Sequence, residues 1–411
     1  MKQRYNELNH ALCVRAVLEA FEGKWLRSDV IQLANKYGGV THGQLKREQH
    51  TGECWAKLEA AEGIAFELEQ RIEDLISGDP DALDLEPVRV HERPDGMTGK
   101  MRKIADLCPM HQLIGHLVKL GLDPLLKAQI EWGQCASIPG RGQTGLKRRV
   151  ERWLRRKSLN IQHGKKTDVS NAYGSLMYLA VIALIAKAIP AARWILCALY
   201  ALARVAPDGH LIIGGYLDGW LFNLAMSYAV RYVLSLEKER RGQRRRLVCR
   251  VVTHMDDFGL LGSRKADVVS AARKLARWME RNLGLHLKLG AEVDFLSTQE
   301  EHCRRKESSP ARRGCPALDM GGFRVHRTYT TVRKCIFRRV RRAYLRAGMD
   351  IAAGKPIQLK RAQRAGSYYG YFKHTASRQV RKRLDADIIK KLCGLAVARQ
   401  TIKVRRKPYA A

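Results

Sequence analysis

The stretch from Arg245 to Ser263, RRLVCRVVTHMDDFGLLGS, places two adjacent acids between two apolar runs. Residues 247–253 are rich in valine and residues 258–261 are apolar, so both runs are predicted strands. The acids Asp256 and Asp257 then fall at the turn of a hairpin. An acid pair in an exposed turn is usually only solvated. Both flanks are expected to be buried here, however, and a buried carboxylate must be paired, hydrogen-bonded or bound to metal.

A third acid upstream completes a candidate metal site. Asp168, in KKTDVSNAY, follows a short basic segment with strand character. Carboxylates are hard oxygen ligands suited to Mg²⁺. Three of them on two neighbouring strands could hold two metal ions about 3.5 to 4 Å apart, which is the arrangement used for in-line phosphoryl transfer. The sequence therefore predicts that Asp168 meets Asp256 and Asp257 in space.

These motifs resemble those of reverse transcriptases of the bacterial retroelement and group II intron-like type. Asp168 with the aromatic Tyr173 five residues on, and the tetrad at 254–257, are similar to the two carboxylate motifs of that family. Leu211 to Asn223, LIIGGYLDGWLFN, is similar to the turn and helix that hold template and incoming nucleotide. SIPGRG, at 137–142, resembles a segment that joins fingers to palm in bacterial members.

The resemblance covers about residues 88 to 375, with its motifs in the family's order. It implies an α+β right-hand polymerase with fingers, a palm of antiparallel sheet packed on helices, a helical thumb and an N-terminal helical extension. The expected domains are a helical extension at 1–87, fingers and palm at 88–328, and a basic helical thumb at 329–411. The expected reaction is RNA-directed addition of deoxynucleotides to a primer 3'-hydroxyl, with two Mg²⁺ ions, or Mn²⁺ in their place.

The resemblance also implies roles for single residues. The expected catalytic residues are Asp168, Asp256, Asp257 and Lys288, and the expected metal ligands are Asp168, Val169, Asp256 and Asp257. The expected substrate-binding residues are Lys100, Arg102, Tyr173, Gly214 and Asn223. Tyr173 would exclude ribonucleotides by a clash with the 2'-hydroxyl, and Lys288 would protonate the departing pyrophosphate. Local alternatives remain for these residues. Tyr173 could be a core residue, and Lys288 could be a solvated lysine just past a helix. Lys100 and Arg102 could belong to a solvated basic strand.

Charge predicts the partner class. The 411 residues include 75 Lys and Arg against 40 Asp and Glu, a net charge of +35, with an ordinary 45% of hydrophobic residues. A polyanion is the expected partner. Residues 331–411 alone carry 23 Lys and Arg against three acids, and residues 143–157 form a second basic segment. The residues expected to bind nucleic acid are Arg141, Arg148, Arg149, Arg333, Lys334, Arg338 and Arg341.

Aromatic residues at 368, 369, 371 and 372 interleave with Arg364 and Lys373, which fits stacking on nucleic acid or, alternatively, the core of a basic helical bundle. Elsewhere, periodicity predicts three or so helices in residues 1–86, a hairpin at 88–104 and a helix at 265–282. A helix pair broken at Gly121 and Pro124 is expected in 110–130. Residues 318–325 are expected to form a strand pair.

Two adjacent positions depart from the family's pattern. Asp218 and Gly219 stand where a polar pair such as Ser-Gln is usual, and an acid beside a template phosphate is unfavourable unless it binds a base or a cation. This departure keeps open a template-independent or protein-primed polymerase of a phage-defence system. A non-catalytic RNA-binding protein on a polymerase scaffold and a replicase that makes RNA are further alternatives.

Cysteine usage and hydropathy predict a cytoplasmic protein. The ten cysteines include no pair at CxxC spacing, and the N-terminus lacks an apolar signal core. The apolar residues 176–206 are divided by charges and by Pro190, which predicts two buried helices and no membrane span. An RNA template, a DNA or RNA primer, deoxynucleoside triphosphates and an accessory protein are the expected partners, in a bacterial or phage retroelement, a diversity-generating system or a defence system.

Overall fold

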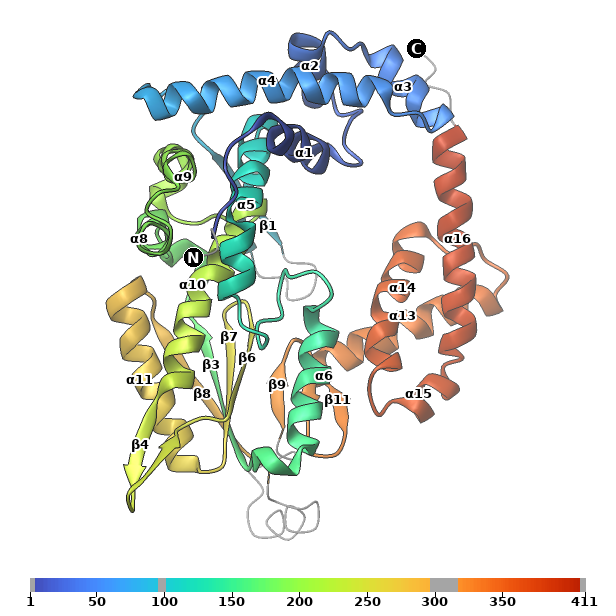
Figure 1. The fold of residues 1–411 in the computed structure, drawn as a ribbon. Helices are drawn as coiled ribbons and strands as arrows, with labels where there is room; N and C mark the ends of the chain where they lie inside the picture. Colours follow the sequence, from blue (N-terminus) through green and yellow to red (C-terminus); the bar gives the residue numbers. More distant parts are fainter. Residues whose placement is uncertain (1–3, 95–100, 296–316, 407–411) are drawn as a thin grey trace. The chain divides into compact units, whose positions relative to one another are not determined.

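The computed structural model describes residues 4–94, 101–295 and 317–406, and Lys100 lies outside these ranges (Figure 1). The chain forms two compact units, each assembled from separate segments. The first unit contains residues 1–137, 169–235 and 273–288, and the second contains residues 138–168, 236–272 and 289–411. These bounds cross the expected ones at 87 and 328, so the division into fingers, palm and thumb stays a prediction.

Four helices begin the first unit, where three or so were expected: α1 (His10–Phe21), α2 (Ser28–Gly38), α3 (His42–Thr51) and α4 (Trp55–Ser77). Their starts carry capping side chains. Asn9 accepts a hydrogen bond from the backbone of Leu12 at α1, and Thr41 and Gln44 form a reciprocal capping box at α3. Gly63 of α4 lies so close to α2 that a Cβ there would sit 2.2 Å from the carbonyl oxygen of Tyr37. Glycine is therefore required at this helix crossing.

The predicted hairpin follows as β1 (Arg89–Pro94) and β2 (Met101–Asp106), which pair antiparallel from Arg89 opposite Asp106 to Pro94 opposite Met101. Its turn lies outside the described residues. The backbone amide of Ala105 donates to the carbonyl of Ile213 at 2.9 Å, so β2 is held along a loop more than a hundred residues later in the chain.

The expected break in residues 110–130 is wrong, because α5 (Pro109–Gln129) is one helix with Pro124 inside it. A proline leaves the carbonyl four residues earlier without its intrahelical donor. Here the side chain of Asn6 donates to that carbonyl, on Leu120, at 2.8 Å, and the backbone amide of Asn6 donates to the carbonyl of Gly121 at 2.9 Å. Gly121 serves packing, since a Cβ there would lie 2.4 Å from the ring of Trp194.

The two apolar helices predicted around Pro190 are α8 (Tyr178–Ala188) and α9 (Arg193–Val205). The short α7 (Ala172–Ser175) precedes them, and the turn η2 (Pro207–Gly209) and the long α10 (Tyr216–Ser235) follow. Over the described part of the chain, no helix combines the length and apolar character needed to cross a membrane.

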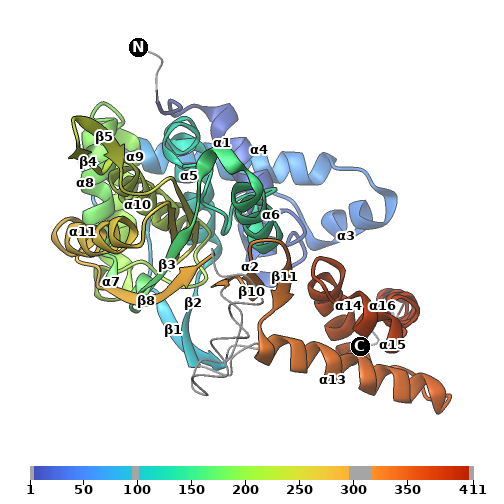
Figure 2. The same cartoon turned by 90° about the horizontal axis from the view of Figure 1, so that it is seen from below.

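A four-stranded antiparallel sheet dominates the second unit, with strand order β6-β7-β3-β8 (Figures 1 and 2). Its strands are β3 (His163–Val169), β6 (Arg250–His254), β7 (Asp257–Gly262) and β8 (Leu287–Asp294). The two apolar runs of the opening stretch are therefore strands, as predicted. After Asp257, every residue of β7 is buried, with Phe258 at 0% exposure, so the carboxylate stands at the end of a dry strand.

Smaller elements complete the second unit. They are α6 (Gly142–Arg155), the turn η1 (Lys157–Leu159), the hairpin β4 (Glu237–Arg240) and β5 (Gln243–Arg246), and α11 (Lys265–Leu283), which continues into the first unit. The expected strand pair is present as β9 (Leu318–Met320) and β10 (Phe323–Val325), and β11 (Thr330–Val332) adds a third strand.

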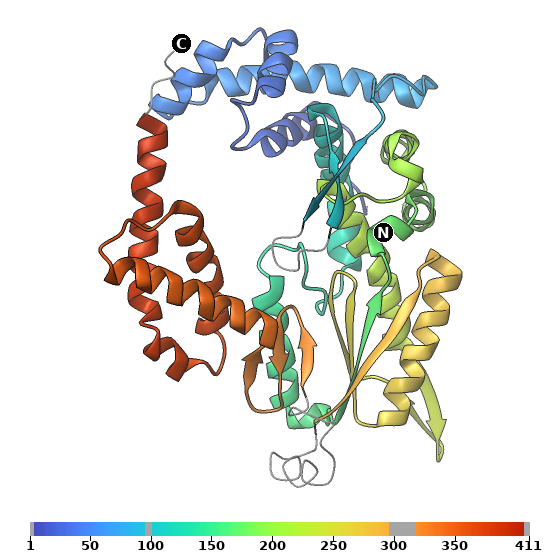
Figure 3. The same ribbon diagram turned by 180° about the vertical axis from the view of Figure 1, so that it is seen from behind.

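The C-terminal helices α13 (Lys334–Ala352), α14 (Leu359–Lys373), α15 (Arg378–Arg383) and α16 (Ala386–Arg406) form the orange and red group of Figure 3. Their core includes Tyr344, which donates a hydrogen bond to the carbonyl of Ala365 at 2.9 Å, and Phe372, which is 1% exposed. Phe372 is therefore a core residue. Tyr369 and Tyr371 hydrogen-bond to Asp387 and Gln143, respectively. Of the two alternatives for these aromatics, the helical core holds for Phe372.

Candidate active site

The structure brings Asp168 and Asp257 together. Asp168 lies near the end of β3, Asp257 begins β7, and the two are direct partners in the antiparallel register. Directly opposed residues project from the same face of a sheet, with Cβ atoms about 4.5 to 5.5 Å apart. Alternation along β3 sends Thr167 and Val169 to the other face, where both are buried. The two carboxylates therefore lie on one face, at one end of the two central strands of the sheet.

The turn that carries Asp256 has an unusual backbone. His254 pairs with Asp257, so Met255 and Asp256 form a two-residue hairpin turn. Met255 has φ 53°, in the left-handed region where glycine is usual. Non-glycine residues persist there when their surroundings force it, and such positions gather at functional sites. Asp256 is half-buried at the second turn position.

A lysine completes the charge balance at this face. Lys166 is two residues before Asp168 on β3, and its Nζ lies 2.8 Å from Oδ1 of Asp257. Burial raises the pKa of the Asp257 carboxyl, and the hydrogen bond and charge of Lys166 lower it again. The charge of Asp168 raises the same pKa, and Arg333 lowers it. The site is thus a pair of facing carboxylates that already accommodates one positive charge.

Other titratable groups lie close enough to Asp257 to interact with it electrostatically. Burial lowers the pKa of His254, and Asp257 partly opposes that shift. Arg333, at the start of α13, holds Oδ1 of Asp319 through Nε at 2.7 Å and a terminal nitrogen at 2.6 Å. Arg333 was expected to bind nucleic acid, and its guanidinium is already committed to this acid while it also acts on the pKa of Asp257.

The donor set fits a divalent cation. Mg²⁺ is commonly bound by one or two carboxylates and completes its shell with water and substrate phosphates. Asp168 and Asp257 supply two such carboxylates on one face, where the ammonium of Lys166 already lies against one of them. In residues 4–94, 101–295 and 317–406, no three or more His, Cys, Asp or Glu side chains are grouped to hold a metal ion. Further ligands would then come from backbone, water, substrate or the half-buried Asp256 of the adjoining turn.

The predicted substrate-binding residues lie in the first unit. Tyr173 of α7 stacks on Phe222 of α10, with ring centroids 5.0 Å apart, and its hydroxyl lies 3.8 Å from where a Cβ on Gly219 would sit. Gly214 has φ 111°, which suits glycine. Arg102 is exposed on β2, opposite Arg93.

Asn223 is buried and links two segments of the first unit. It is 2% exposed, and its side-chain nitrogen donates to the carbonyls of Ala136 and Gly219, both at 3.0 Å. The amide therefore ties α10 to the segment that leads into SIPGRG, and its expected role in substrate binding stays a prediction. Lys288, by contrast, is exposed as the second residue of β8, the strand that neighbours β3, and does not simply follow a helix.

The predicted nucleic-acid-binding residues lie on two helices of the second unit. Arg148 of α6 is exposed, and Arg141 and Arg149 are half-buried. Lys334, Arg338 and Arg341 are exposed on α13 at helical spacing. On the opposite side of α13, Ile336 and Val340 are buried. The charges of α13 therefore form one solvent-facing stripe.

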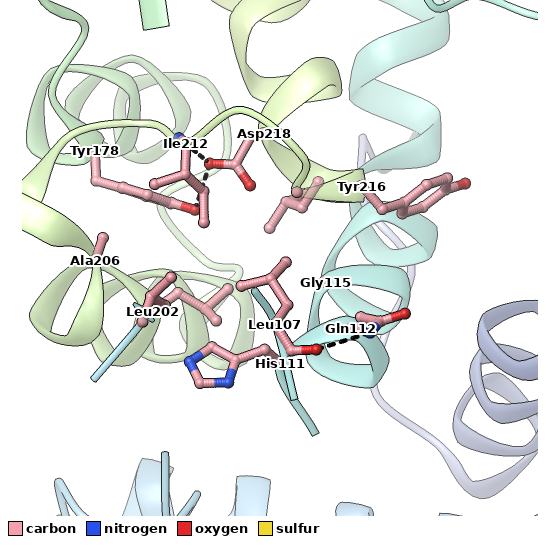
Figure 4. Close-up of a pocket in the computed structure, with 13 residues that line it drawn as sticks. Leu107, His111, Gln112, Gly115, Tyr178, Leu202, Ala206, Ile212, Tyr216 and Asp218 are labelled. Atoms are coloured by element: carbon pink, nitrogen blue, oxygen red, sulfur yellow. Dashed lines mark hydrogen bonds between the residues drawn. The ribbon is translucent and has the colours of Figure 1, made fainter. Parts of the chain in front are cut away.

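Asp218 is not the exposed acid that the sequence analysis considered beside a template phosphate. The carboxylate is 3% exposed and faces the interior of the first unit, where Oδ1 accepts hydrogen bonds from the Tyr178 hydroxyl and the Ile212 backbone amide, both at 2.9 Å (Figure 4). Burial raises the pKa of Asp218 to about 6, against the effect of these donors. The carboxylate of Asp218 is therefore not exposed for direct contact with a template phosphate.

Sequence reasoning missed Lys166 and the inward orientation of Asp218. The first had a usable signal, because a residue two positions before Asp168 on a strand must share its face. The second had none, because the partner Tyr178 lies forty residues away in the sequence.

Comparisons with known proteins found only distant structural similarity among the matches given below. No family model and no curated protein matches the sequence. The chain is similar in structure to a Sicinivirus RNA-dependent RNA polymerase, with 13% identity, a TM-score of 0.42, and coverage of 80% of this chain and 66% of that one. It is also similar to apo telomerase from Candida tropicalis, with 10% identity, a TM-score of 0.43, and coverage of 79% and 58%.

A form of that telomerase truncated from its C-terminal domain has 11% identity and a TM-score of 0.36, with coverage of 73% of this chain and 80% of that one. The chain spans less than two thirds of the first two structures. Its own residues must therefore carry any assignment of function.

Proposed function

We propose that this protein is an RNA-directed DNA polymerase. The observation that carries the proposal is the register pair of Asp168 and Asp257, two carboxylates on one face with a lysine ammonium beside them. Like charges that are partly withdrawn from water repel, and a protein retains such a pair where a cation or a proton compensates. The reaction is attack by a primer 3'-hydroxyl on the α-phosphorus of a deoxynucleoside triphosphate, which releases pyrophosphate.

Residues on and beside the paired strands β3 and β7 hold the reacting groups. Asp168 and Asp257 would bind Mg²⁺, with Asp256 and the Val169 carbonyl as further candidate ligands. When bound, the cation supplies Lewis acidity to the attacking hydroxyl and to the phosphate oxygens. Lys166 lies against Asp257 as the resident cation, and its hydrogen bond and charge partly oppose the rise in the pKa of that carboxyl that burial causes. Lys288, exposed on the strand next to β3, is the proposed donor of a proton to pyrophosphate.

Residues of the first unit handle the nucleotide. Tyr173 is held by its stack on Phe222, which suits a fixed steric barrier to a ribose 2'-hydroxyl. Arg102 is exposed for contact with the triphosphate. If Tyr173 has this role, Tyr173→Ala admits ribonucleotides while deoxynucleotide incorporation persists. An unchanged preference for deoxynucleotides in that variant would argue for a core tyrosine.

The inward carboxylate of Asp218 supports templated synthesis, because a buried acid is not exposed for direct contact with a template phosphate. The exposed charges of α13 and α6 favour a nucleic-acid template and primer. Binding should weaken steeply with salt, and removing Arg338 or Arg341 should reduce the salt slope by about 1 each. Copying of a defined RNA separates templated synthesis from addition without a template, and the RNA that copurifies with the protein identifies its biological setting.

The decisive test is extension of a labelled primer on an RNA template with Mg²⁺. We expect Asp168→Asn and Asp257→Asn each to reduce incorporation by about 10³-fold or more while salt-sensitive RNA binding persists. Asp267→Asn is the matched control, because Asp267 is a buried acid of the same unit that pairs with Lys238. Full synthesis by Asp257→Asn would refute the site, and RNA binding without synthesis by the wild type would favour a non-catalytic RNA-binding protein.

A further inference from the structure

The carboxylate of Asp218 lies where three segments of the first unit meet. It belongs to the first turn of α10, and its Oδ1 accepts one hydrogen bond from Tyr178 of α8 and one from the backbone of Ile212 (Figure 4). At 3% exposure it is one of the most deeply buried acids of the described chain. A carboxylate is retained at such a position only when its acceptor capacity is used.

The loop before α10 is shaped around this carboxylate. A Cβ on Gly215 would lie 1.7 Å from Oδ2 of Asp218, so any side chain at 215 would displace the acid or the loop. The neighbouring Gly214, with φ 111°, turns the chain here. A Cβ on Gly214 would also lie 3.3 Å from the side chain of Ile104 on β2. Two adjacent glycines therefore let the loop pass between the acid and the hairpin.

The same loop holds the basic hairpin. The carbonyl of Ile213 accepts a hydrogen bond from the backbone amide of Ala105 on β2, at 2.9 Å. At its other end, the amide of Leu211 donates to the carbonyl of Leu176 at 2.9 Å. One acceptor on Asp218 thus fixes Ile212, and the next residue fixes β2, which carries the exposed Arg102.

We propose that Asp218 is a positioning residue that fixes the loop Ile212–Gly215, and through it the β1–β2 hairpin, for binding of the incoming nucleoside triphosphate. This inference rests on the proposed polymerase function and extends it to a residue with no direct contact to template or nucleotide. The required chemistry is acceptance of two hydrogen bonds, which an asparagine Oδ1 can also provide and a leucine cannot.

The adjoining cavity supports a positioning role over a ligand site. It is lined by Tyr178, Asp218, His111 and Tyr216 among others, and its volume of about 20 Å³ has room for about one water molecule. A nucleotide or another small metabolite cannot enter so small a space. His111, which is 6% exposed, has no hydrogen-bond partner for Nε2 among the described residues, which makes it a candidate partner for such a water.

The test compares Asp218→Asn with Asp218→Leu and Tyr178→Phe in steady-state primer extension. We expect the asparagine variant to keep the wild-type KM for deoxynucleotide within about threefold, because both donors keep an acceptor. Asp218→Leu should raise that KM at least tenfold and leave the KM for template-primer unchanged, and Tyr178→Phe should lie between them. Ser227→Ala is the control, because it removes a buried hydrogen bond from the same helix, to the carbonyl of Leu224. It should lower stability without changing the KM for deoxynucleotide.

Hydrogen exchange separates failure of this inference from failure of the polymerase proposal, since it needs no activity. Asp218→Leu and Tyr178→Phe should speed exchange in peptides that cover residues 101–106 and 211–216, whereas Asp218→Asn and Ser227→Ala should not. Loop protection that is equal in Tyr178→Phe and wild type, or a KM for deoxynucleotide that Asp218→Leu leaves unchanged, would overturn the inference. If Asp218→Leu does not fold, Tyr178→Phe decides the outcome alone.

Discussion

Asp257 is half-buried and Asp218 is buried, and burial raises the pKa of both carboxyls, yet their surroundings differ in kind. Asp257 faces a second acid, Asp168, and a lysine ammonium at 2.8 Å. Asp218 faces a tyrosine hydroxyl and a backbone amide, both neutral. The negative charge of Asp257 is compensated by a positive charge, whereas the carboxylate of Asp218 is stabilised by neutral hydrogen-bond donors.

This difference in surroundings indicates which of the two carboxylates can bind a metal ion. A carboxylate that accepts hydrogen bonds from fixed neutral donors orders the chain around it. A carboxylate compensated by a lysine side chain beside another acid can exchange that cation for a metal ion. The contrast predicts that charge is indispensable at Asp257 and dispensable at Asp218.

The largest effect expected from this contrast is on catalysis. Asp168→Asn and Asp257→Asn should each remove about 10³-fold or more of primer extension, and the double variant should be no worse than either single one, because both acids serve one cation. Single-turnover extension with Mg²⁺ measures this. Additive losses in the double variant would mean that the two acids act separately.

A smaller effect is expected in the pH dependence of stability. The pKa of Asp218 is raised from 3.8 to about 6 in the folded state, so the native protein favours the protonated form. Its contribution is fully present below pH 3.8 and is lost as pH rises through about 6. The free energy of unfolding of wild type, minus that of Asp218→Asn, should therefore fall by about 3 kcal/mol across this window.

Urea unfolding of both proteins at intervals between pH 3.5 and 7 measures this difference, and carboxylates common to both cancel. A constant difference would mean that Asp218 titrates normally. A difference that grows with pH would mean that the donors outweigh burial, which would make Asp218 resemble a paired acid and remove the contrast.

Much of the acid pair could be predicted from sequence, because the strand pattern around Asp168 and Asp257 is local. The surroundings of Asp218 could not, since Tyr178 and Gly215 become its neighbours only through the fold. The helix through Pro124 could not be predicted either. Pro124 suggests a helix break in the sequence, but Asn6, near the start of the chain, donates the missing hydrogen bond. Rules based on residue type miss compensation by distant residues.

The smallest effect is expected at Lys166. Lys166→Met removes a partly exposed ion pair, worth about 1 kcal/mol, and with it the competitor of a metal cation. We expect stability without metal to fall slightly and the affinity for Mn²⁺ to rise by up to about fivefold. Weaker Mn²⁺ binding in this variant would mean that Lys166 supports the cation and does not compete with it.

Titration of Mn²⁺ followed by electron paramagnetic resonance, on wild type, Asp168→Asn, Asp257→Asn and Asp218→Asn, tests the central claim most directly. The account predicts that wild type and Asp218→Asn bind the ion alike, and that either substitution in the facing pair weakens binding by at least tenfold. Equal binding by all four proteins would contradict it.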